Sequence, residues 1–474
     1  MLVAGVDCST QSTKVVLCHA EDGTVIGTGS APHPDGTEAD PRAWWDALLT
    51  AGRGLLDRAD SVGVAAQQHG MVAVDEDGRV VRPALLWNDT RSARQAEDLI
   101  AEFGGPGEWA RRTGSVPTAS FTVTKLRWMA EQEPANADRT SMVMLPHDWV
   151  TWQLGLSEEA GGTARPVTDR GDASGTGYFS PTGTSWLPSL AKTALGRELE
   201  LPRLAAPAEA VGRTRWGAAL SAGTGDNMGA ALGLGLGDGD VVISIGTSGT
   251  AFAVTPAAAA DPTGAVAGFA DATGRFLPLV CTLNAARVLT VTARLLDVDA
   301  DTLSALALAA RSGAGGLTLL PYLDGERTPN RPDAAGVLSG LTTANATREN
   351  LARAAVEGVL CGLADAMDHL IAAGVQPRRV LLIGGGARSE AVRTLAPGIL
   401  GTAVVVPVAA EYVAIGAARQ AAWALAPGRE PPPWPGPEAS GYEAEPVPQV
   451  REKYAALRDA TETWQRPSQE GSVP

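Results

Sequence analysis

Short apolar runs separated by polar turns open the chain. Three such runs within residues 2–29 predict three strands, and Glu21-Asp-Gly23 between the last two is typical of a hairpin turn. Tryptophans and leucines recur at helical spacing over residues 41–58, which predicts a helix. Residues 62–66 form another short apolar run that predicts a buried strand. The pattern therefore leads from strands to a helix and back to a strand.

The second half of the chain repeats this opening order. Residues 240–245 predict a buried strand, Gly246-Thr-Ser-Gly-Thr250 forms a polar turn, and a strand resumes at residues 251–254. In the first half, Asp7-Cys-Ser-Thr-Gln-Ser-Thr13 occupies the place of the polar turn. The halves share no sequence identity, so the likeness is one of pattern. Further on, the pattern predicts helices at residues 347–372, 389–398, 411–425 and 448–464 and strands at 380–383 and 403–406.

The length of the chain predicts more than one domain. A chain of 474 residues is too long to fold around a single hydrophobic core, and its length is typical of two large domains. Ser221-Ala-Gly-Thr-Gly225 is a predicted hinge, and the prolines clustered at 426–437 indicate a surface strap. We therefore predict an N-terminal domain at 1–220, a C-terminal domain at 221–430, and a proline-rich strap with a C-terminal helix at 431–474.

Composition and charge exclude several classes of function. The net charge of −15 argues against a nucleic-acid partner, which would require a basic face. No lysine follows a glycine, so the chain lacks the usual phosphate-loop motif. The four cysteines have no metal-site spacing, and no apolar run reaches 18 residues. With no signal-peptide pattern at the start, we expect a cytoplasmic protein that binds no membrane; a homodimer stays open.

Two polar turns are the first candidates for chemistry. Asp7 ends an apolar strand and opens a turn whose backbone N–H groups and hydroxyls suit phosphate oxygens, while its carboxylate suits Mg²⁺. The turn at Gly246–Thr250 is of the same kind. Either turn alone is also typical of an ordinary hairpin. Together they favour a nucleotide held between two domains.

Two glycine-bordered segments extend this interpretation. Gly384-Gly-Gly-Ala-Arg-Ser389 follows a predicted strand and leaves room for adenine against the backbone, with close packing of helix on strand as the alternative. Gly225-Asp-Asn-Met-Gly229 places a carboxylate at the start of a small-residue segment. Asp226 is suited to act as a general base and Asn227 to bind a hydroxyl, with a helix N-cap as the alternative role of Asp226.

Two longer signatures resemble those of the FGGY family of carbohydrate kinases. Ser120-Phe-Thr-Val-Thr-Lys-Leu-Arg-Trp-Met-Ala-Glu-Gln132 is similar to the first, and Gly336-Val-Leu-Ser-Gly-Leu341 followed by Asn350-Leu-Ala-Arg-Ala-Ala-Val-Glu357 is similar to the second. The resemblance covers about residues 1–464. It implies an α/β fold of two ribonuclease-H-like (actin-like ATPase) domains with a cleft between them. It also implies phosphoryl transfer to a carbohydrate, with ATP and Mg²⁺.

The sugar is indicated by a narrower resemblance. Gln68-His69-Gly70, Arg82–Arg91 and Pro321–Pro329 are similar to segments of family members that phosphorylate D-xylulose to D-xylulose 5-phosphate, although Gln68 replaces a usual methionine. The insertion Glu158–Pro166 also departs from the pattern. The alternatives are another sugar or polyol (ribulose, glycerol or gluconate) and a non-kinase actin-like ATPase.

The resemblance implies a role for each matched residue. The catalytic base is Asp226, and the predicted sugar contacts are Gln68, His69, Asp226 and Asn227. The predicted nucleotide contacts are Thr10, Gln11, Ser12, Lys14, Gly246, Thr247, Ser248, Gly385, Gly386 and Glu390. Asp7 and Asp226 are the predicted metal ligands. We expect structural roles for Trp87, Lys125 and Trp128, while Glu326 and Arg327 stay undecided.

Overall fold

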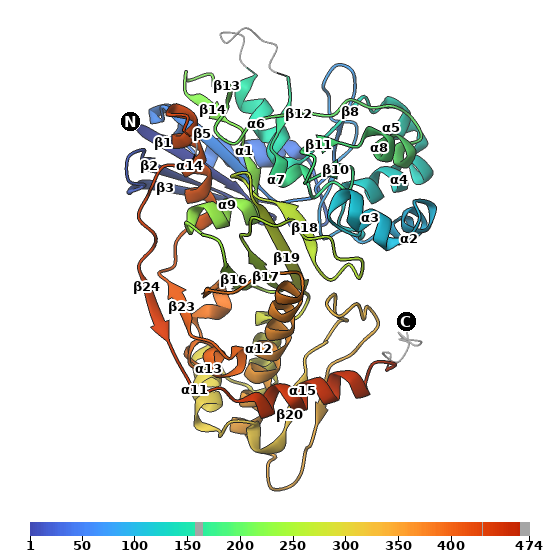
Figure 1. The fold of residues 1–474 in the computed structure, drawn as a ribbon. Helices are drawn as coiled ribbons and strands as arrows, with labels where there is room; N and C mark the ends of the chain where they lie inside the picture. The colour runs from blue at the N-terminus through green and yellow to red at the C-terminus, as the bar shows by residue number, and fades with distance from the viewer. Residues whose placement is uncertain (157–164, 429, 465–474) are drawn as a thin grey trace. The chain divides into compact units, whose positions relative to one another are not determined.

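The structure is a computed structural model that describes residues 1–156, 165–428 and 430–464. The chain forms two compact units, neither of which is one continuous stretch (Figure 1). Unit 1 comprises Met1–Gly237, Val254–Pro278 and Ala410–Gly436, and unit 2 comprises Asp238–Ala253, Leu279–Ala409 and Pro437–Pro474. The domain boundaries predicted at 220 and 430 divide the chain into consecutive stretches, whereas each unit is assembled from several stretches. These boundaries stay a prediction. Most of the insertion at 158–166 lies outside the described residues.

Unit 1 is built on one mixed sheet. Its strands follow the order β13-β14-β5-β1-β2-β3, with β15 beside β5. Their bounds are β1 Leu2–Cys8, β2 Ser12–His19, β3 Val25–Pro32, β5 Ser61–Ala66, β13 Ala210–Arg213, β14 Ala219–Ser221 and β15 Thr224–Gly225. The strands β1, β2 and β3 pair antiparallel, whereas β5 runs parallel to β1. The three opening strands predicted from the apolar runs are therefore confirmed.

One face of this sheet is covered by a conventional apolar core. Helix α1 (Pro41–Ala51) contributes the buried side chains of Trp44 and Leu48 to it. The helix was predicted to reach residue 58, but it ends at Gly52, and Gly54 follows with a φ of +70°. A left-handed residue of this kind ends a helix, so only a short 3₁₀ turn, Leu56–Arg58, follows.

The other face is covered by α14 (Tyr412–Leu425), which also contacts α9 (Asp226–Gly233). Glycines make these close contacts: a Cβ on Gly5 would lie 1.8 Å from the Ala414 carbonyl oxygen, and one on Gly416 would lie 1.8 Å from that of Gly229. The small-residue helix predicted at 411–425 is thus confirmed. Its small side chains let the backbones of helix and sheet approach closely.

The rest of unit 1 between β3 and β13 consists of short elements. The helices are α2 Ala93–Glu102, α3 Pro106–Thr113, α4 Thr122–Gln132, α5 Pro134–Arg139, α6 Pro146–Gly155, α7 Arg170–Ala173 and α8 Pro188–Leu195. The strands are β4 Glu38–Ala39, β6 Val72–Val74, β7 Ala84–Leu85, β8 Met142–Met144, β9 Val167–Thr168, β10 Phe179–Ser180, β11 Ser185–Trp186 and β12 Arg203–Leu204. Strand β18 (Ala267–Ala270) also belongs to this unit.

Unit 2 repeats the strand order of unit 1. Its sheet runs β19-β17-β16-β22-β23-β24, with bounds β16 Asp240–Ile245, β17 Gly249–Ala253, β19 Phe276–Thr282, β22 Arg379–Ile383, β23 Val404–Pro407 and β24 Ala439–Tyr442. As in unit 1, an antiparallel pair is followed by a parallel neighbour, because β16 pairs antiparallel with β17 and parallel with β22. The repeated strand–turn–strand pattern in the sequence thus reflects a repeated sheet.

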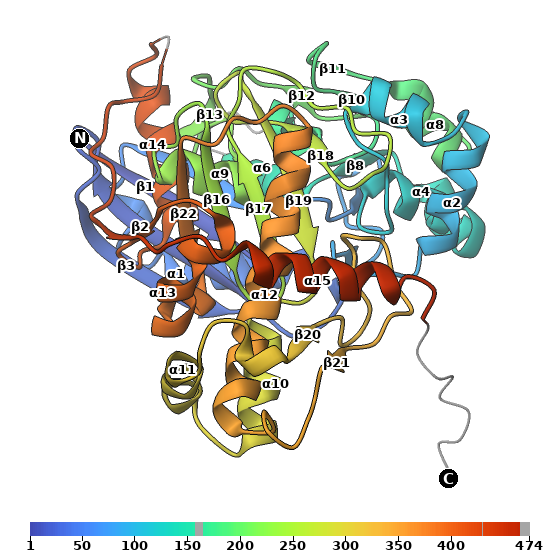
Figure 2. The same cartoon turned by 60° about the horizontal axis from the view of Figure 1, so that its bottom comes forward.

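Three of the helices predicted in the second half form close to the expected residues, as α12 Arg348–Ala372, α13 Glu390–Leu400 and α15 Pro448–Ala460. Two further helices, α10 Ala286–Leu296 and α11 Ala300–Ala309, were not predicted. The Thr347 side chain caps α12 by accepting from the Asn350 N–H, and α15 crosses beside α12 (Figure 2). A two-stranded sheet, β20 (Thr318–Leu320) with β21 (Val337–Ser339), completes the unit. Among the described residues, no helix has both the length and the apolar character needed to cross a membrane.

Candidate active site

The candidate residues of unit 1 gather at the carboxyl ends of three neighbouring strands. Strands β1 and β15 both pair parallel with β5, so Asp7 lies opposite Ala65 and Thr224 lies opposite the same residue. Gln67 and Gln68 follow β5 directly, and Asp226 follows β15 directly. Since parallel strands end at the same edge of a sheet, the register brings side chains from distant parts of the sequence together, as at many ligand sites.

Asp7 is a buried carboxylate. It is 3% exposed, accepts a hydrogen bond from the Ser9 hydroxyl and lies opposite Lys14 in the β1–β2 hairpin. Burial raises the pKa of Asp7 to about 6, against the lowering effects of Ser9 and Lys14, and Glu411 adds a further rise. A carboxylate that loses hydration without gaining a full cationic partner is suited to bind a cation.

Asp226 begins helix α9 and stays partly exposed. Its Oδ1 accepts from the Asn227 backbone N–H at 2.8 Å and from the Asn227 side-chain amide at 2.9 Å. Burial is the main cause that raises the pKa of Asp226 to about 7, and repulsion from Asp7 and Asp172 contributes. A carboxyl group with a pKa near 7 is matched to the work of a general base.

Two buried side-chain amides beside Asp226 have unused donors. Gln68 Oε1 accepts from the Asn227 amide at 3.0 Å, and Gln67 Oε1 accepts from the Thr10 hydroxyl at 3.4 Å. The Nε2 groups of Gln67 and Gln68 are buried and have no hydrogen-bond partner among the described residues. Buried donors normally find partners, so these amides suit a ligand rich in hydroxyl groups.

His69 is held in a strained backbone conformation. Its φ is +66°, which is uncommon for a residue other than glycine. The ring Nδ1 lies 2.6 Å from the Gly175 carbonyl oxygen, and the ring packs on Phe121 with centroids 4.7 Å apart. The carbonyl oxygen of His69 accepts from Lys125 Nζ at 3.0 Å. Lys125 therefore fixes the His69 segment, in agreement with its predicted structural role.

The first phosphate-type turn carries additional contacts. The Thr10 hydroxyl accepts from the Trp87 indole N–H at 2.8 Å, and Lys14 Nζ lies 2.7 Å from Glu411 Oε2. Gln11 is exposed and Ser12 is half-buried, so both are accessible. Trp87, for which a structural role is expected, thus fixes a residue of the turn through this hydrogen bond.

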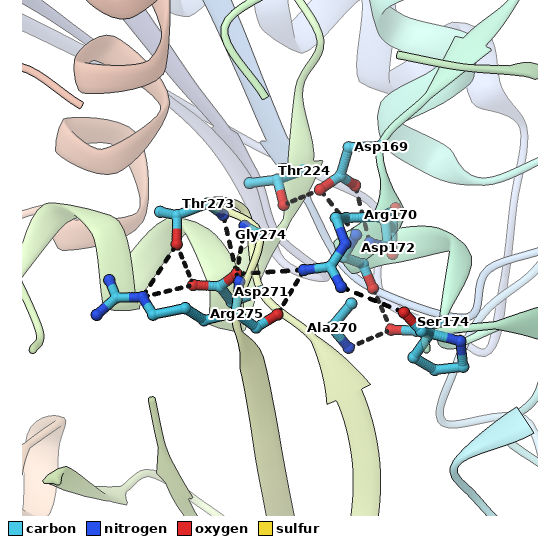
Figure 3. A network of polar contacts seen from close by, with 12 residues as sticks. Asp169, Arg170, Asp172, Ser174, Thr224, Ala270, Asp271, Thr273, Gly274 and Arg275 are labelled. Atoms are coloured by element: carbon cyan, nitrogen blue, oxygen red, sulfur yellow. Dashed lines mark hydrogen bonds and ion pairs between the residues drawn. The ribbon is translucent and has the colours of Figure 1, made fainter. Parts of the chain in front are cut away.

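A polar network behind Asp226 positions the turn that precedes it (Figure 3). Asp169 caps the short helix α7, and its Oδ2 accepts from the Thr224 hydroxyl at 2.9 Å. Buried His147 lies beneath the same turn: its Nδ1 is 2.5 Å from Asp172 Oδ2, and a Cβ on Gly223 would meet its ring at 2.5 Å. Burial alone would lower the pKa of His147, but the neighbouring carboxylates of Asp148 and Asp172 raise it above its ordinary value. These contacts fix the backbone that presents Asp226.

The polar turn of unit 2 ends β16. Gly246 accepts from the Ala286 N–H at 2.8 Å through its carbonyl oxygen, while Thr247 is exposed and Ser248 half-exposed. The start of α10 therefore holds this turn by its backbone. The side chain of Thr247 is therefore accessible to a ligand, and that of Ser248 is partly accessible.

The three glycines after β22 differ in what surrounds them. A Cβ on Gly384 would lie 2.8 Å from the Ile245 carbonyl oxygen, and one on Gly386 would lie 2.3 Å from the Ile245 side chain. A Cβ on Gly385 would meet nothing within 4 Å. Gly384 and Gly386 thus serve close packing within the protein, the alternative considered from the sequence, whereas Gly385 is open. Glu390 is exposed in the first turn of α13, a favourable place for a negative charge.

Comparison with known proteins identifies the family. The model of the N-terminal domain of FGGY carbohydrate kinases matches residues 2–241, and that of the C-terminal domain matches residues 241–425. The chain belongs to the FGGY family of carbohydrate kinases. A xylulose kinase of Streptomyces coelicolor is 48% identical over 442 residues, which are 90% of this chain and 88% of that protein. The FGGY assignment predicted from the two signatures is thus confirmed, and the enzyme is a phosphotransferase that uses ATP.

Solved structures agree on the fold of this FGGY kinase. The crystal structure of xylulose kinase from Bifidobacterium adolescentis has a TM-score of 0.88 at 45% identity, covering 97% of this chain and 99% of that one. Gluconate kinase from Lactobacillus acidophilus has a TM-score of 0.86 at 22% identity, covering 98% and 99%, which shows the fold alone. The predicted α/β, ribonuclease-H-like and actin-like fold class is confirmed. Kinases of different sugars share it, so the fold does not select the sugar.

Two residues of this FGGY kinase were not predicted from the sequence as parts of the site. Gln67 immediately precedes the predicted Gln68, and its buried amide donor has no partner among the described residues. The only signal for Gln67 in the sequence is that it is a second polar residue directly after a buried strand. Glu411 reaches Lys14 from far along the chain, and its only signal is a charge just before a helix of small residues.

Glu326, left undecided, is explained by its contacts in unit 2. It is 3% exposed, and its carboxylate accepts from the Leu283 N–H at 2.5 Å and from the Asn284 amide at 3.0 Å. Burial raises its pKa, and these bonds oppose the rise. Glu326 therefore fixes the connection after β19 and has a structural role.

Proposed function

We propose that this FGGY kinase transfers the γ-phosphoryl group of ATP to the terminal hydroxyl of D-xylulose, giving D-xylulose 5-phosphate and ADP. The observation that carries the proposal is that two comparisons agree. The relative with 48% sequence identity is named a xylulose kinase. The solved structure with a TM-score of 0.88 and 45% identity is also named a xylulose kinase. The buried, partnerless amide donors of Gln67 and Gln68 support a hydroxyl-rich ligand in unit 1.

Asp226 is proposed as the general base. The residue is partly exposed, and the pKa of about 7 suits its carboxyl group to accept the proton of the attacking hydroxyl as the phosphoryl group is transferred in line. Such help is worth about 10²–10⁴-fold in rate. Asn227 holds Oδ1 of this carboxylate and Gln68 holds the Asn227 amide, so the base is fixed in orientation. Gln68, His69 and Asn227 are proposed as sugar contacts.

Mg²⁺ is proposed to be held on the side of Asp7 and Asp226. The donor set fits a hard cation, because both carboxyl groups have raised pKa values caused chiefly by burial, and the charge of Asp7 disfavours ionisation of Asp226. When bound, the ion would neutralise charge on the phosphate oxygens. Asp7 is proposed as the principal ligand, which leaves Asp226 to accept the proton.

The nucleotide contacts are proposed on two polar turns and one glycine turn. Thr10, Gln11, Ser12 and Lys14 are proposed to bind phosphate oxygens in unit 1, and Gly246, Thr247 and Ser248 are proposed to do so in unit 2. For the adenosine we propose Gly385 first, because its Cα faces open space, with Gly386 and Glu390 beside it.

The proposal is tested with purified enzyme and a panel of D-xylulose, D-ribulose, glycerol and D-gluconate, with coupled detection of ADP. D-xylulose is expected to give the highest kcat/KM. A clear preference for glycerol or gluconate would overturn the choice of sugar but keep the kinase. ADP release independent of every sugar would support the alternative, an actin-like ATPase.

A further inference from the structure

A cavity on a different side of helix α9 from the catalytic carboxylate has the character of a ligand site. It has a volume of about 220 Å³ and lies wholly among residues of unit 1. The apolar part of its lining includes Met228, Ala231 and Leu232 from α9. The polar part is Arg275, Arg419, Asp271, Thr273 and Glu430. None of these residues belongs to the proposed sugar or nucleotide contacts.

Arg419 brings an uncompensated positive charge to this cavity. Its guanidinium donates to the carbonyl oxygens of Leu232 at 2.9 Å and Pro432 at 2.8 Å. Among the described residues, no carboxylate lies within ion-pair distance of it. Burial lowers the pKa of Arg419, and repulsion from Arg275 lowers it further. An anion bound between two guanidinium groups that repel each other across a cavity reduces this repulsion.

The carboxylates of the cavity balance only part of this charge, because Asp271 forms an ion pair with Arg275 at 3.8 Å, whereas Arg419 has none among the described residues. Asp271 is buried, and its Oδ1 accepts from the backbone N–H groups of Thr273, Gly274 and Arg275 at 2.9, 2.9 and 2.6 Å. It also lies 3.5 Å from Arg170, whereas Arg275 Nε is 3.8 Å away. Glu430 is exposed to solvent, where screening weakens its charge. Asp271 is thus shared among its own loop, Arg170 and Arg275. Arg275 also donates to Thr273 Oγ1 at 3.2 Å and to the Leu236 carbonyl oxygen at 3.5 Å. Among the described residues, Nη1 of Arg275 and Nη2 of Arg419 are left as donors for a ligand.

The cavity is joined to the catalytic base by short contacts. Met228, on its wall, would lie 3.1 Å from a Cβ on Gly225 and 2.9 Å from one on Gly171, so it packs directly beneath the turn before Asp226. Figure 3 shows a second connection, from Arg275 and Asp271 through Arg170 to the Asp169–Thr224 hydrogen bond. A ligand that shifts Arg275 or Met228 would therefore act on the backbone that presents Asp226.

We propose that this cavity binds a small phosphate-bearing anion and that its occupation changes the rate of phosphoryl transfer. Arginine recognises phosphate through paired N–H donors, which Arg275 and Arg419 supply, and the apolar wall suits a short carbon chain. The binding stands independently of the sugar. The effect on rate rests on the proposed role of Asp226.

Binding is tested by isothermal titration calorimetry of the full chain with inorganic phosphate and with 3-phosphoglycerate. Saturating ADP is present so that the nucleotide turns are occupied. Arg275→Gln should weaken binding about tenfold or more, because it removes a charge-assisted hydrogen bond. Glu430→Gln should tighten it several-fold by removing a like charge. Arg53→Gln, an exposed arginine of unit 1 outside the cavity, is the matched control and should leave binding unchanged.

Arg419 is not substituted in this test, because its backbone hydrogen bonds make it a risk to folding. Ala231→Leu instead fills the cavity without changing charge and should abolish binding, with thermal melting as the check that the variant folds. Tighter binding of 3-phosphoglycerate than of phosphate identifies an organic ester as the occupant; equal binding identifies phosphate itself. Absence of binding at millimolar concentration, or binding that Arg275→Gln and Ala231→Leu leave unchanged, would overturn the site.

The effect on rate is tested by steady-state kinetics with the best sugar of the panel. Addition of 3-phosphoglycerate should change kcat at least twofold in the parent and not in Ala231→Leu. Binding by calorimetry with an unchanged kcat would overturn the coupling and leave the site standing. Failure of every sugar on the panel would refute the proposed function and leave the calorimetric result untouched.

Discussion

The side-chain amide of Asn227 donates to Gln68 Oε1 at 3.0 Å, joining residues 159 positions apart in the chain. The same amide also donates to Asp226 Oδ1 at 2.9 Å. The proposed base and the proposed sugar segment are therefore fixed to each other through one amide group. Substitution of any of these three residues should therefore change the rate of sugar phosphorylation.

Asp226→Asn separates two roles of this residue. If Asp226 is the general base, the substitution keeps the shape and removes proton acceptance, so kcat should fall by at least about a hundredfold while sugar affinity changes little. Steady-state kinetics give kcat, and calorimetry gives sugar binding. If Asp226 serves only at the helix start, asparagine serves nearly as well, and kcat within a few-fold of the parent would remove it from the mechanism.

The pH profile should report the same group. Burial raises the pKa of Asp226 to about 7, and a base acts only when it is ionised, so kcat/KM for the sugar should fall as pH decreases below about 7 and level off above it. Asp7, with a pKa of about 6, should add a second loss at lower pH. Initial rates from about pH 5 to pH 9 test this, with stability checked at each pH. A profile that stays level down to about pH 5.5 would contradict the assignment.

Gln68→Met tests whether the buried amide meets the sugar. The Nε2 of Gln68 has no protein partner among the described residues, so its loss should cost little stability. The substitution also removes Oε1, which accepts from the Asn227 amide at 3.0 Å, and the loss of this bond should cost about 0.5–1.5 kcal/mol, measured by thermal melting. If it donates to a sugar hydroxyl, KM for the sugar should rise about two- to tenfold, the value of one neutral hydrogen bond. KM for ATP serves as the internal control and should stay constant. A variant with parental sugar KM and kcat would show that the amide does not contact the substrate.

Gly385→Val and Gly386→Val form a matched pair. A side chain at Gly385 meets no protein atom within 4 Å, so this variant should fold normally and raise KM for ATP at least about tenfold if adenosine lies against it. A side chain at Gly386 collides with Ile245, so that variant should lose stability, about 1–3 kcal/mol for an overpacked site. Thermal melting and ATP kinetics of both variants separate the effects. Parental ATP kinetics in Gly385→Val would place adenosine elsewhere.

The repeated sheets, the long helix at 348–372 and the small-residue helix were predictable because apolar periodicity reports directly on burial. The end of α1 was missed, since the pattern continues past Gly52 while the backbone does not. In the site, Asp7 was predictable as a polar residue at a strand end and Asp226 as a carboxylate between glycines at the start of a helix, whereas Gln68 was predicted from the resemblance of its segment to the family. Gln67 and Glu411 were not, because their places depend on strand register and on a distant segment. The packing role of Gly386 required the position of Ile245.

Helix α14 has a consequence for the order in which the protein is made. It lies on the sheet that begins at residue 2, with Gly5 against Ala414 and Gly63 against Ala417, although it is translated more than 400 residues later. One face of the first sheet therefore stays uncovered during nearly all of synthesis on the ribosome. Such an exposed apolar face is prone to aggregation and is a substrate for chaperones. A chain truncated before residue 410 should accordingly be found in inclusion bodies or bound to chaperones, even though Asp7 and Asp226 have both been translated.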